Sequence, residues 1–240
     1  MTDIHSCDIS GVPSLLIHPA GTPRATILLY HGLGSNVEKY SFFATVISHW
    51  GFKVVVPEIP HHGVRGMLNY ADPKEVQQHF FRIVQQGIKE AEAIAAELTK
   101  ENENLSVIGH SLGGFIASGT FSKVSGIQSA IVINSSCAWT KFEELFREKS
   151  GLPPMTEQEK TALQSLDPLK NVKLGERKRL LLLHGKEDTT VPIDSQRYFM
   201  SEMANVPGEY LQLVEYSGVN HLITLGMLEQ SKKWLDGVYA

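Results

Sequence analysis

Short apolar runs alternate along the chain with longer segments in which apolar residues recur at helical spacing. Runs of about six mostly apolar residues are typical of strands that are covered on both faces, as in a parallel sheet. The segments between them are long enough for the helices that connect one parallel strand to the next. The six predicted central strands comprise residues 25–30, 53–59, 105–109, 129–134, 179–184 and 210–216.

Local signals place the helices between these strands. Asp72 and Pro73 open the longest helix, with the aspartate as N-cap and the proline in the first helical position. Asp194 is expected to cap the helix that follows Pro192. The predicted helices comprise residues 36–49, 72–98, 112–122, 194–204 and 221–235.

This alternation predicts the fold class. Strands and helices in turn imply right-handed crossovers and a three-layer α/β sandwich with a mostly parallel central sheet. The first twenty residues, with an apolar stretch at 12–17, are expected to add an antiparallel hairpin at one edge. A chain of 240 residues can bury a substantial core, so we expect a single domain over residues 1–240.

Residues 139–172 interrupt the alternation, because they separate two predicted strands without a simple crossover helix. Phe142, Leu145 and Phe146 have helical spacing, two prolines follow at 153–154, and residues 156–166 predict another short helix. An insertion at this point would lie over the carboxyl ends of the strands, where open α/β sheets bind ligands. We therefore predict a small helical cap over residues 139–172.

Composition and charge limit the classes of binding partner and the compartment to be expected. The formal net charge is −4 and the cationic residues are scattered, which gives no reason to expect nucleic acid or an anionic membrane as a partner. The two cysteines, Cys7 and Cys137, are expected to be free thiols in a reducing compartment. The N-terminal segment lacks the pattern of a secretory signal, and no apolar run approaches the roughly 20 residues of a membrane span. These observations predict a cytoplasmic protein.

A candidate nucleophile lies directly after the third of these strands. Residues 109–113 read Gly-His-Ser-Leu-Gly, which matches the pattern G-x-S-x-G, and Gly114 follows. The serine of this pattern stands on a sharp strand-to-helix turn, and side chains at the glycine positions would collide with the turn or a neighbouring strand. An apolar run precedes the motif and a predicted helix follows it, so Ser111 is the expected nucleophile.

A serine hydroxyl needs a base, and the base needs an acid that orients it. In strand–turn–helix hydrolases the chain order is serine, acid, histidine. His221 follows the last predicted strand and satisfies this order, whereas His184 ends the strand before Asp188. Asp188 follows that strand by four residues and is the expected acid, with Glu187 as its neighbouring competitor.

Acyl transfer also requires donors for a developing oxyanion. The Leu112 amide follows the nucleophile at a helix N-terminus, and the loop at residues 31–34 (His-Gly-Leu-Gly) should supply a second donor, the Leu33 amide. His31 is expected to brace this loop rather than to act on substrate.

These motifs resemble those of the α/β-hydrolase superfamily, in order and spacing from residue 25 to the C-terminus. Within it the chain is similar to small bacterial carboxylesterases and to the hydrolase domains related to prolyl oligopeptidase. Residues 57–66 resemble the family's loop Pro-Asp-x-x-x-His-Gly-x-Arg-Gly, with Glu58 in place of the aspartate. The resemblance implies hydrolysis of an ester or amide through an acyl-enzyme, without a cofactor.

The expected substrate is a small-molecule carboxylic ester with a short or medium acyl group. His110, His61, Phe142 and Phe146 are the expected substrate-contacting side chains. No metal is predicted, because adjacent histidines at 61–62 diverge and no zinc-binding partner set accompanies them. Three alternatives stay open: hydrolysis of thioesters, amides or peptides by the same residues, another reaction such as that of a lyase or haloperoxidase, and a non-catalytic binding protein on this fold.

Overall fold

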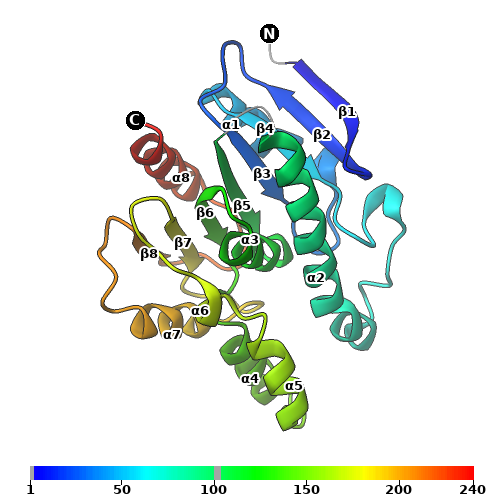
Figure 1. Cartoon of the computed structure of the whole chain (residues 1–240). Coiled ribbons are helices and arrows are strands. Elements are labelled where there is room, and N and C mark those ends of the chain that lie inside the picture. Colours follow the sequence, from blue (N-terminus) through cyan, green and yellow to red (C-terminus); the bar gives the residue numbers. More distant parts are fainter. Residues whose placement is uncertain (1–2, 100–103) are drawn as a thin grey trace.

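An eight-stranded, mostly parallel sheet forms the centre of the computed structural model, which describes residues 3–99 and 104–240 (Figure 1). The strand order is β1-β2-β4-β3-β5-β6-β7-β8. The pairs β1–β2 and β2–β4 are antiparallel, as expected for an N-terminal edge hairpin, whose first two residues lie outside the described part. The strands are β1 (Asp3–Ile9), β2 (Val12–His18), β3 (Thr26–Tyr30), β4 (Lys53–Pro57), β5 (Leu105–His110), β6 (Ile127–Ile133), β7 (Arg179–Gly185) and β8 (Leu211–Tyr216).

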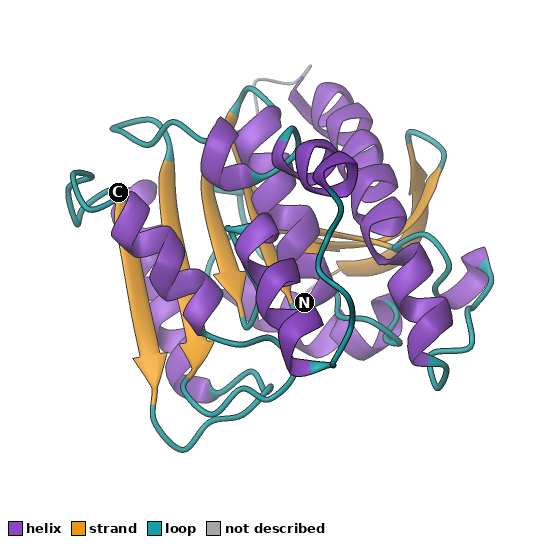
Figure 2. Cartoon of the chain, turned by 90° about the horizontal axis from the view of Figure 1, so that it is seen from below, coloured by secondary structure: helices purple, strands orange, loops and turns teal. Residues whose placement is uncertain are grey.

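Helices cover both faces of this sheet (Figure 2). Alternate residues of β3 point to opposite faces, so Leu28 packs in one core cluster and Ile27 in the other. Helices α2 (Pro73–Leu98), α3 (Leu112–Lys123) and α7 (Asp194–Glu202) contribute to the first cluster. Helices α1 (Val37–His49) and α8 (Leu225–Val238) contribute to the second. This arrangement confirms the three-layer α/β-hydrolase sandwich.

The longest helix begins where the sequence predicted, whereas two other helix starts differ. Asp72 caps α2 by accepting a hydrogen bond from Lys74 N. The prediction that Asp194 is an N-cap is wrong: Ile193 occupies the cap position, and the Asp194 carboxylate contacts the Arg197 guanidinium at 3.2 Å. The last helix begins at residue 225 rather than 221, because the Thr224 side chain caps it.

The insertion between β6 and β7 is helical, and its two longer helices project below the sheet in Figure 1. It contains α4 (Trp139–Lys149), α5 (Glu157–Gln164) and the unpredicted one-turn helix α6 (Pro168–Asn171). The Phe142 ring packs on the Phe115 ring of α3, with centroids 4.8 Å apart. None of the helices in the described residues combines the length and apolar character that a membrane span requires.

A buried carboxylate joins the two ends of this insertion. Asp167 is 2% exposed and accepts hydrogen bonds from Trp139 N (3.0 Å) and Thr140 N (2.8 Å), at the start of α4. The same side chain caps α6 through Leu169 N at 3.1 Å. Asp167 therefore satisfies amides at two helix starts that no intrahelical acceptor reaches.

Replacing this carboxylate should be costly for the fold. Asp167→Ala leaves several buried amides without acceptors, and we expect the free energy of unfolding to fall by about 2–4 kcal/mol. Urea denaturation measures the effect. Asp194→Ala is the control, because that carboxylate is 64% exposed and should contribute less than about 0.5 kcal/mol. Equal losses in the two variants would contradict the assigned anchor.

Candidate active site

Ser111 occupies a strained turn between β5 and α3. Its backbone angles φ and ψ are 55° and −123°, in a region that residues other than glycine rarely adopt. A Cβ at Gly109 would lie 2.0 Å from the Gly113 carbonyl oxygen, and a Cβ at Gly113 would lie 2.3 Å from the Tyr30 carbonyl oxygen. Because neither residue has a side chain, the backbones of β5, α3 and the loop after β3 can contact one another directly.

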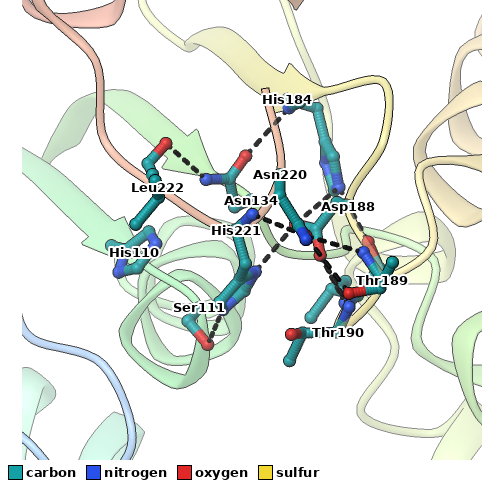
Figure 3. A network of polar contacts seen from close by, with 12 residues as sticks. His110, Ser111, Asn134, His184, Asp188, Thr189, Thr190, Asn220, His221 and Leu222 are labelled. Atoms are coloured by element: carbon teal, nitrogen blue, oxygen red, sulfur yellow. Dashed lines mark hydrogen bonds and ion pairs between the residues drawn. The ribbon is translucent and has the colours of Figure 1, made fainter. Parts of the chain in front are cut away.

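The structure brings Ser111, His221 and Asp188 together from three loops (Figure 3). The distance from Ser111 Oγ to His221 Nε2 is 2.8 Å, and His221 Nδ1 lies 2.7 Å from Asp188 Oδ2. With Nδ1–H donating to the carboxylate, the Nε2 lone pair faces the serine hydroxyl. These are the three side chains that the sequence predicted as acid, base and nucleophile.

Asp188 is held as a carboxylate by its surroundings. Its side chain is fully buried, and Oδ1 accepts hydrogen bonds from the amides of Thr190 and Val191, both at 2.9 Å. Burial alone would raise the pKa of Asp188. Hydrogen bonds with His184, His221 and Val191 N outweigh burial and keep this pKa well below its usual range. The group beside the imidazole is therefore anionic at neutral pH. No sequence pattern indicated the contact with His184.

The loops that carry Asp188 and His221 are tied to each other. Asn220 Oδ1 accepts hydrogen bonds from His221 N (2.8 Å) and Thr189 N (2.9 Å). Glu187 does not replace Asp188: its amide donates to Val219 O at 3.1 Å, and its Oε2 accepts from Val219 N. The acid and the base thus sit on two loops that share several direct hydrogen bonds.

The loop after β3 lies against the nucleophile and is fixed on both sides of Leu33. Gly32 N donates to the Tyr40 hydroxyl at 3.1 Å, and Gly34 N donates to His62 Nε2 at 3.0 Å. A Cβ at Gly32 would lie 3.5 Å from Ser111 Cβ, which places this loop beside the nucleophile. Leu112 is the first residue of α3, so its amide has no acceptor within the helix. The two predicted oxyanion donors thus lie on adjoining segments.

His31 supports this loop through its contact with Gly32 O, and Glu58 contacts the His31 imidazole. The imidazole is fully buried, with Nε2 accepting from Ile59 N at 3.2 Å and Nδ1 lying 3.0 Å from Gly32 O. Glu58 Oε1 lies 2.9 Å from the same Nε2. A Cβ at Gly63 would lie 2.1 Å from Glu58 Oε2. The glutamate therefore reaches the imidazole because residue 63 has no side chain.

His110 lies beside the three converging side chains. Its ring centroid is 5.0 Å from that of His221, and its Nδ1 is 2.9 Å from the Tyr40 hydroxyl. Burial lowers the pKa of His110 to about 3, so the imidazole is neutral at physiological pH. Tyr40 thereby connects His110 to Gly32 of the neighbouring loop, a connection that no sequence pattern indicated.

The other three predicted substrate-contacting residues pack against neighbours outside the series Ser111, His221 and Asp188. Phe142 is buried, and Phe146 stacks on it with ring centroids 6.0 Å apart. His61 is exposed, with φ 62°, and its ring lies 5.9 Å from that of His79. No contact found in the described residues joins His61, Phe142 or Phe146 to Ser111, so their contact with substrate stays a prediction.

Metal-ligating groups are dispersed. Over residues 3–99 and 104–240, no cluster of three or more histidine, cysteine, aspartate or glutamate side chains is arranged to hold a metal ion. Cys7 and Cys137 are both free, and burial raises the pKa of the Cys137 thiol.

Two buried imidazoles should make stability depend on pH. Burial lowers the pKa of His62 to about 4 and that of His110 to about 3, whereas histidine in an unfolded chain titrates near pH 6.5. Below about pH 6.5 the unfolded chain binds protons that the folded chain does not, so the free energy of unfolding falls with pH. Asp188, with its low pKa, loses its own contribution only below about pH 4.

We expect each of these imidazoles to cost up to about 2 kcal/mol of stability between pH 7 and pH 5. Urea denaturation at both pH values measures the loss. His62→Gln retains an acceptor for Gly34 N but cannot titrate, so it should lose less stability over the same interval. An unchanged pH dependence in this variant would refute the assignment.

Comparison with known proteins identifies relatives over most of the chain. The model of the prolyl oligopeptidase family matches residues 39–240. Esterase YjfP of Escherichia coli (strain K12) is 27% identical to this chain, over 93% of this chain and 94% of that protein. The putative esterase YitV of Bacillus subtilis (strain 168) is 25% identical, over 98% of this chain and 99% of that protein.

A solved structure supports the fold independently. TT1662 from Thermus thermophilus superposes with a TM-score of 0.83 at 22% identity, over 100% of this chain and 98% of that chain. The fold and the named relatives together identify a hydrolase. Because the family model covers most of the sequence, this chain belongs to the prolyl oligopeptidase family.

Proposed function

We propose that the protein is a serine hydrolase that cleaves carboxylic esters through an acyl-enzyme. The observation that carries the proposal is the hydrogen-bonded series Ser111–His221–Asp188, with distances of 2.8 and 2.7 Å. The strained turn at Ser111 supports it, because such backbone strain is typical of a nucleophile held out from a sheet.

The roles follow from the donors and acceptors. His221 Nε2 accepts the Ser111 proton as Oγ attacks the ester carbonyl, and the Asp188 carboxylate stabilises the resulting imidazolium. The Leu33 and Leu112 amides donate to the oxyanion of the tetrahedral intermediate. His221 then protonates the leaving alcohol, and water attacks the acyl-enzyme with the same residue as base.

Short or medium acyl esters are the proposed substrate class. Both curated relatives are named as esterases, which favours esters over amides. Leu222 is 67% exposed directly after His221 and offers apolar surface beside the imidazole. The family model favours the alternative of amide or peptide hydrolysis, for which the same three residues would serve.

Removing the nucleophile should abolish turnover. Ser111→Ala cannot form the acyl-enzyme, so we expect kcat for p-nitrophenyl acetate to fall by at least about 10³-fold. Ser122→Ala is the control and should retain full activity, because this serine lies on the same helix and its hydroxyl donates to Gly119 O within its own helix. A fluorophosphonate should phosphonylate Ser111 of the wild-type chain with loss of fluoride, so the mass of the phosphonyl group should appear on the wild type and not on Ser111→Ala. Near-normal turnover in Ser111→Ala would exclude this serine from the mechanism.

The leaving group separates the two substrate classes. We expect kcat/KM to be highest for p-nitrophenyl acetate and butyrate, lower for the octanoate, and lower by at least tenfold for aminoacyl p-nitroanilides. The Ser111→Ala variant gives the background rate for each compound. A higher kcat/KM for the anilides would assign the protein to amide hydrolysis instead.

A further inference from the structure

Asn134 is a fully buried polar residue that the proposed mechanism does not use. It directly follows β6, and its φ is 47°, in the left-handed region that asparagine tolerates better than most residues. Its backbone N–H donates a hydrogen bond to Leu183 O of β7 at 2.9 Å. The backbone turn therefore directs the side chain toward the loops that leave the neighbouring strands.

The Asn134 side chain joins the segments that carry the acid and the base (Figure 3). Oδ1 accepts a hydrogen bond from Gly185 N at 3.0 Å, three residues before Asp188. Nδ2 donates to Leu222 O at 3.0 Å, directly after His221. One carboxamide thus spans two backbones that lie 51 and 88 residues away along the chain.

Close packing makes the position of these loops sensitive to this side chain. A Cβ at Gly185 would lie 2.3 Å from Val219 O and 2.5 Å from Asn220 O, so the two loops already touch through their backbones. Leu222 is 67% exposed, so its own side chain does not fix its backbone, whereas Val219 and Ile223 on either side pack against the second core cluster. The hydrogen bond from Asn134 to Leu222 O therefore restrains the backbone between His221 and the packed residue Ile223.

We propose that Asn134 is a positioning residue that sets the His221 imidazole against Asp188 and Ser111. The proposal rests on the proposed serine hydrolase function. Only a carboxamide of this length supplies an acceptor for Gly185 N and a donor for Leu222 O. An aspartate would keep the acceptor but direct a second oxygen at the Leu222 carbonyl, and would repel it.

The closest test is therefore Asn134→Asp, which keeps shape and removes one donor. We expect kcat for p-nitrophenyl acetate to fall about 10- to 100-fold with KM changed less than threefold, because small misplacements of a catalytic base are costly. The downfield proton resonance of the His221–Asp188 hydrogen bond should shift or disappear. Asn171→Asp is the control. The Asn171 carboxamide also donates to backbone carbonyls, Asp167 O at 2.8 Å and Ser165 O at 3.4 Å, but these lie in the insertion.

Asn134→Gly serves if the aspartate variant does not fold, since glycine accepts the positive φ and removes both ties. The proton resonance is read without substrate, so it tests Asn134 even if wild-type protein fails to cleave esters. If the wild-type protein did not hydrolyse esters, that result would refute the proposed function but not the positioning role of Asn134. A folded variant with kcat within twofold of wild type, a rise in KM alone, or an unchanged resonance despite lower kcat would overturn the positioning role.

Discussion

The constraint on which the site depends is the close approach of three backbones around Ser111. The start of α3 contacts both the end of β5 and the carbonyls of the loop after β3, because Gly109 and Gly113 have no side chains. This packing forces Ser111 into its positive φ and sets the Leu112 amide beside the loop that contains Leu33. The nucleophile and its proposed oxyanion donors are therefore fixed by one set of steric contacts, before any side chain is considered.

Buried polar groups supply the next level of order. Asp188, His31, Glu58 and His62 are all buried beside or beneath the site, and burying such groups is unfavourable unless they are hydrogen-bonded. Each is bonded to, or in close contact with, a segment of the site: Asp188 holds its own loop and His221, His62 holds Gly34, and the His31–Glu58 pair lies under Gly32. For Asp188, His31 and His62 the cost of burial is thereby offset by hydrogen bonds that restrict the loops around the reacting atoms.

Much of the fold was predictable because its signals are local. Continuous apolar runs marked the buried strands to within about two residues, and Asp72 with Pro73 marked the start of α2. The serine motif, the acid and the histidine were found by combining local context with chain order. The start of α8 was misplaced because Thr224, a weaker signal than the apolar spacing, caps it. Asp194 was assigned a cap that its carboxylate does not make: Ile193 occupies the cap position, and the Asp194 carboxylate contacts Arg197.

The residues that could not be predicted share a different property: their partners lie in other elements or loops, from eight to 88 residues away along the chain. Tyr40 contacts Gly32 and His110, and Asn134 contacts two loops that leave later strands. Periodicity and capping rules describe neighbours along the chain, so they carry no information about these contacts. A polar residue at the carboxyl end of β6 was the only available hint for Asn134, since the carboxyl ends of parallel strands converge at one edge.

The nature of these long-range ties explains how such a site tolerates sequence change. Asn134 bonds to the Gly185 amide and the Leu222 carbonyl, and Tyr40 accepts from the Gly32 amide, so each tie ends on backbone atoms. The side chain of Leu222 can therefore vary without loss of the bond to its carbonyl. The insertion is anchored separately, through Asp167 and the ring of Phe142. The contacts that hold the insertion are thus different from those that hold Ser111, His221 and Asp188 in place.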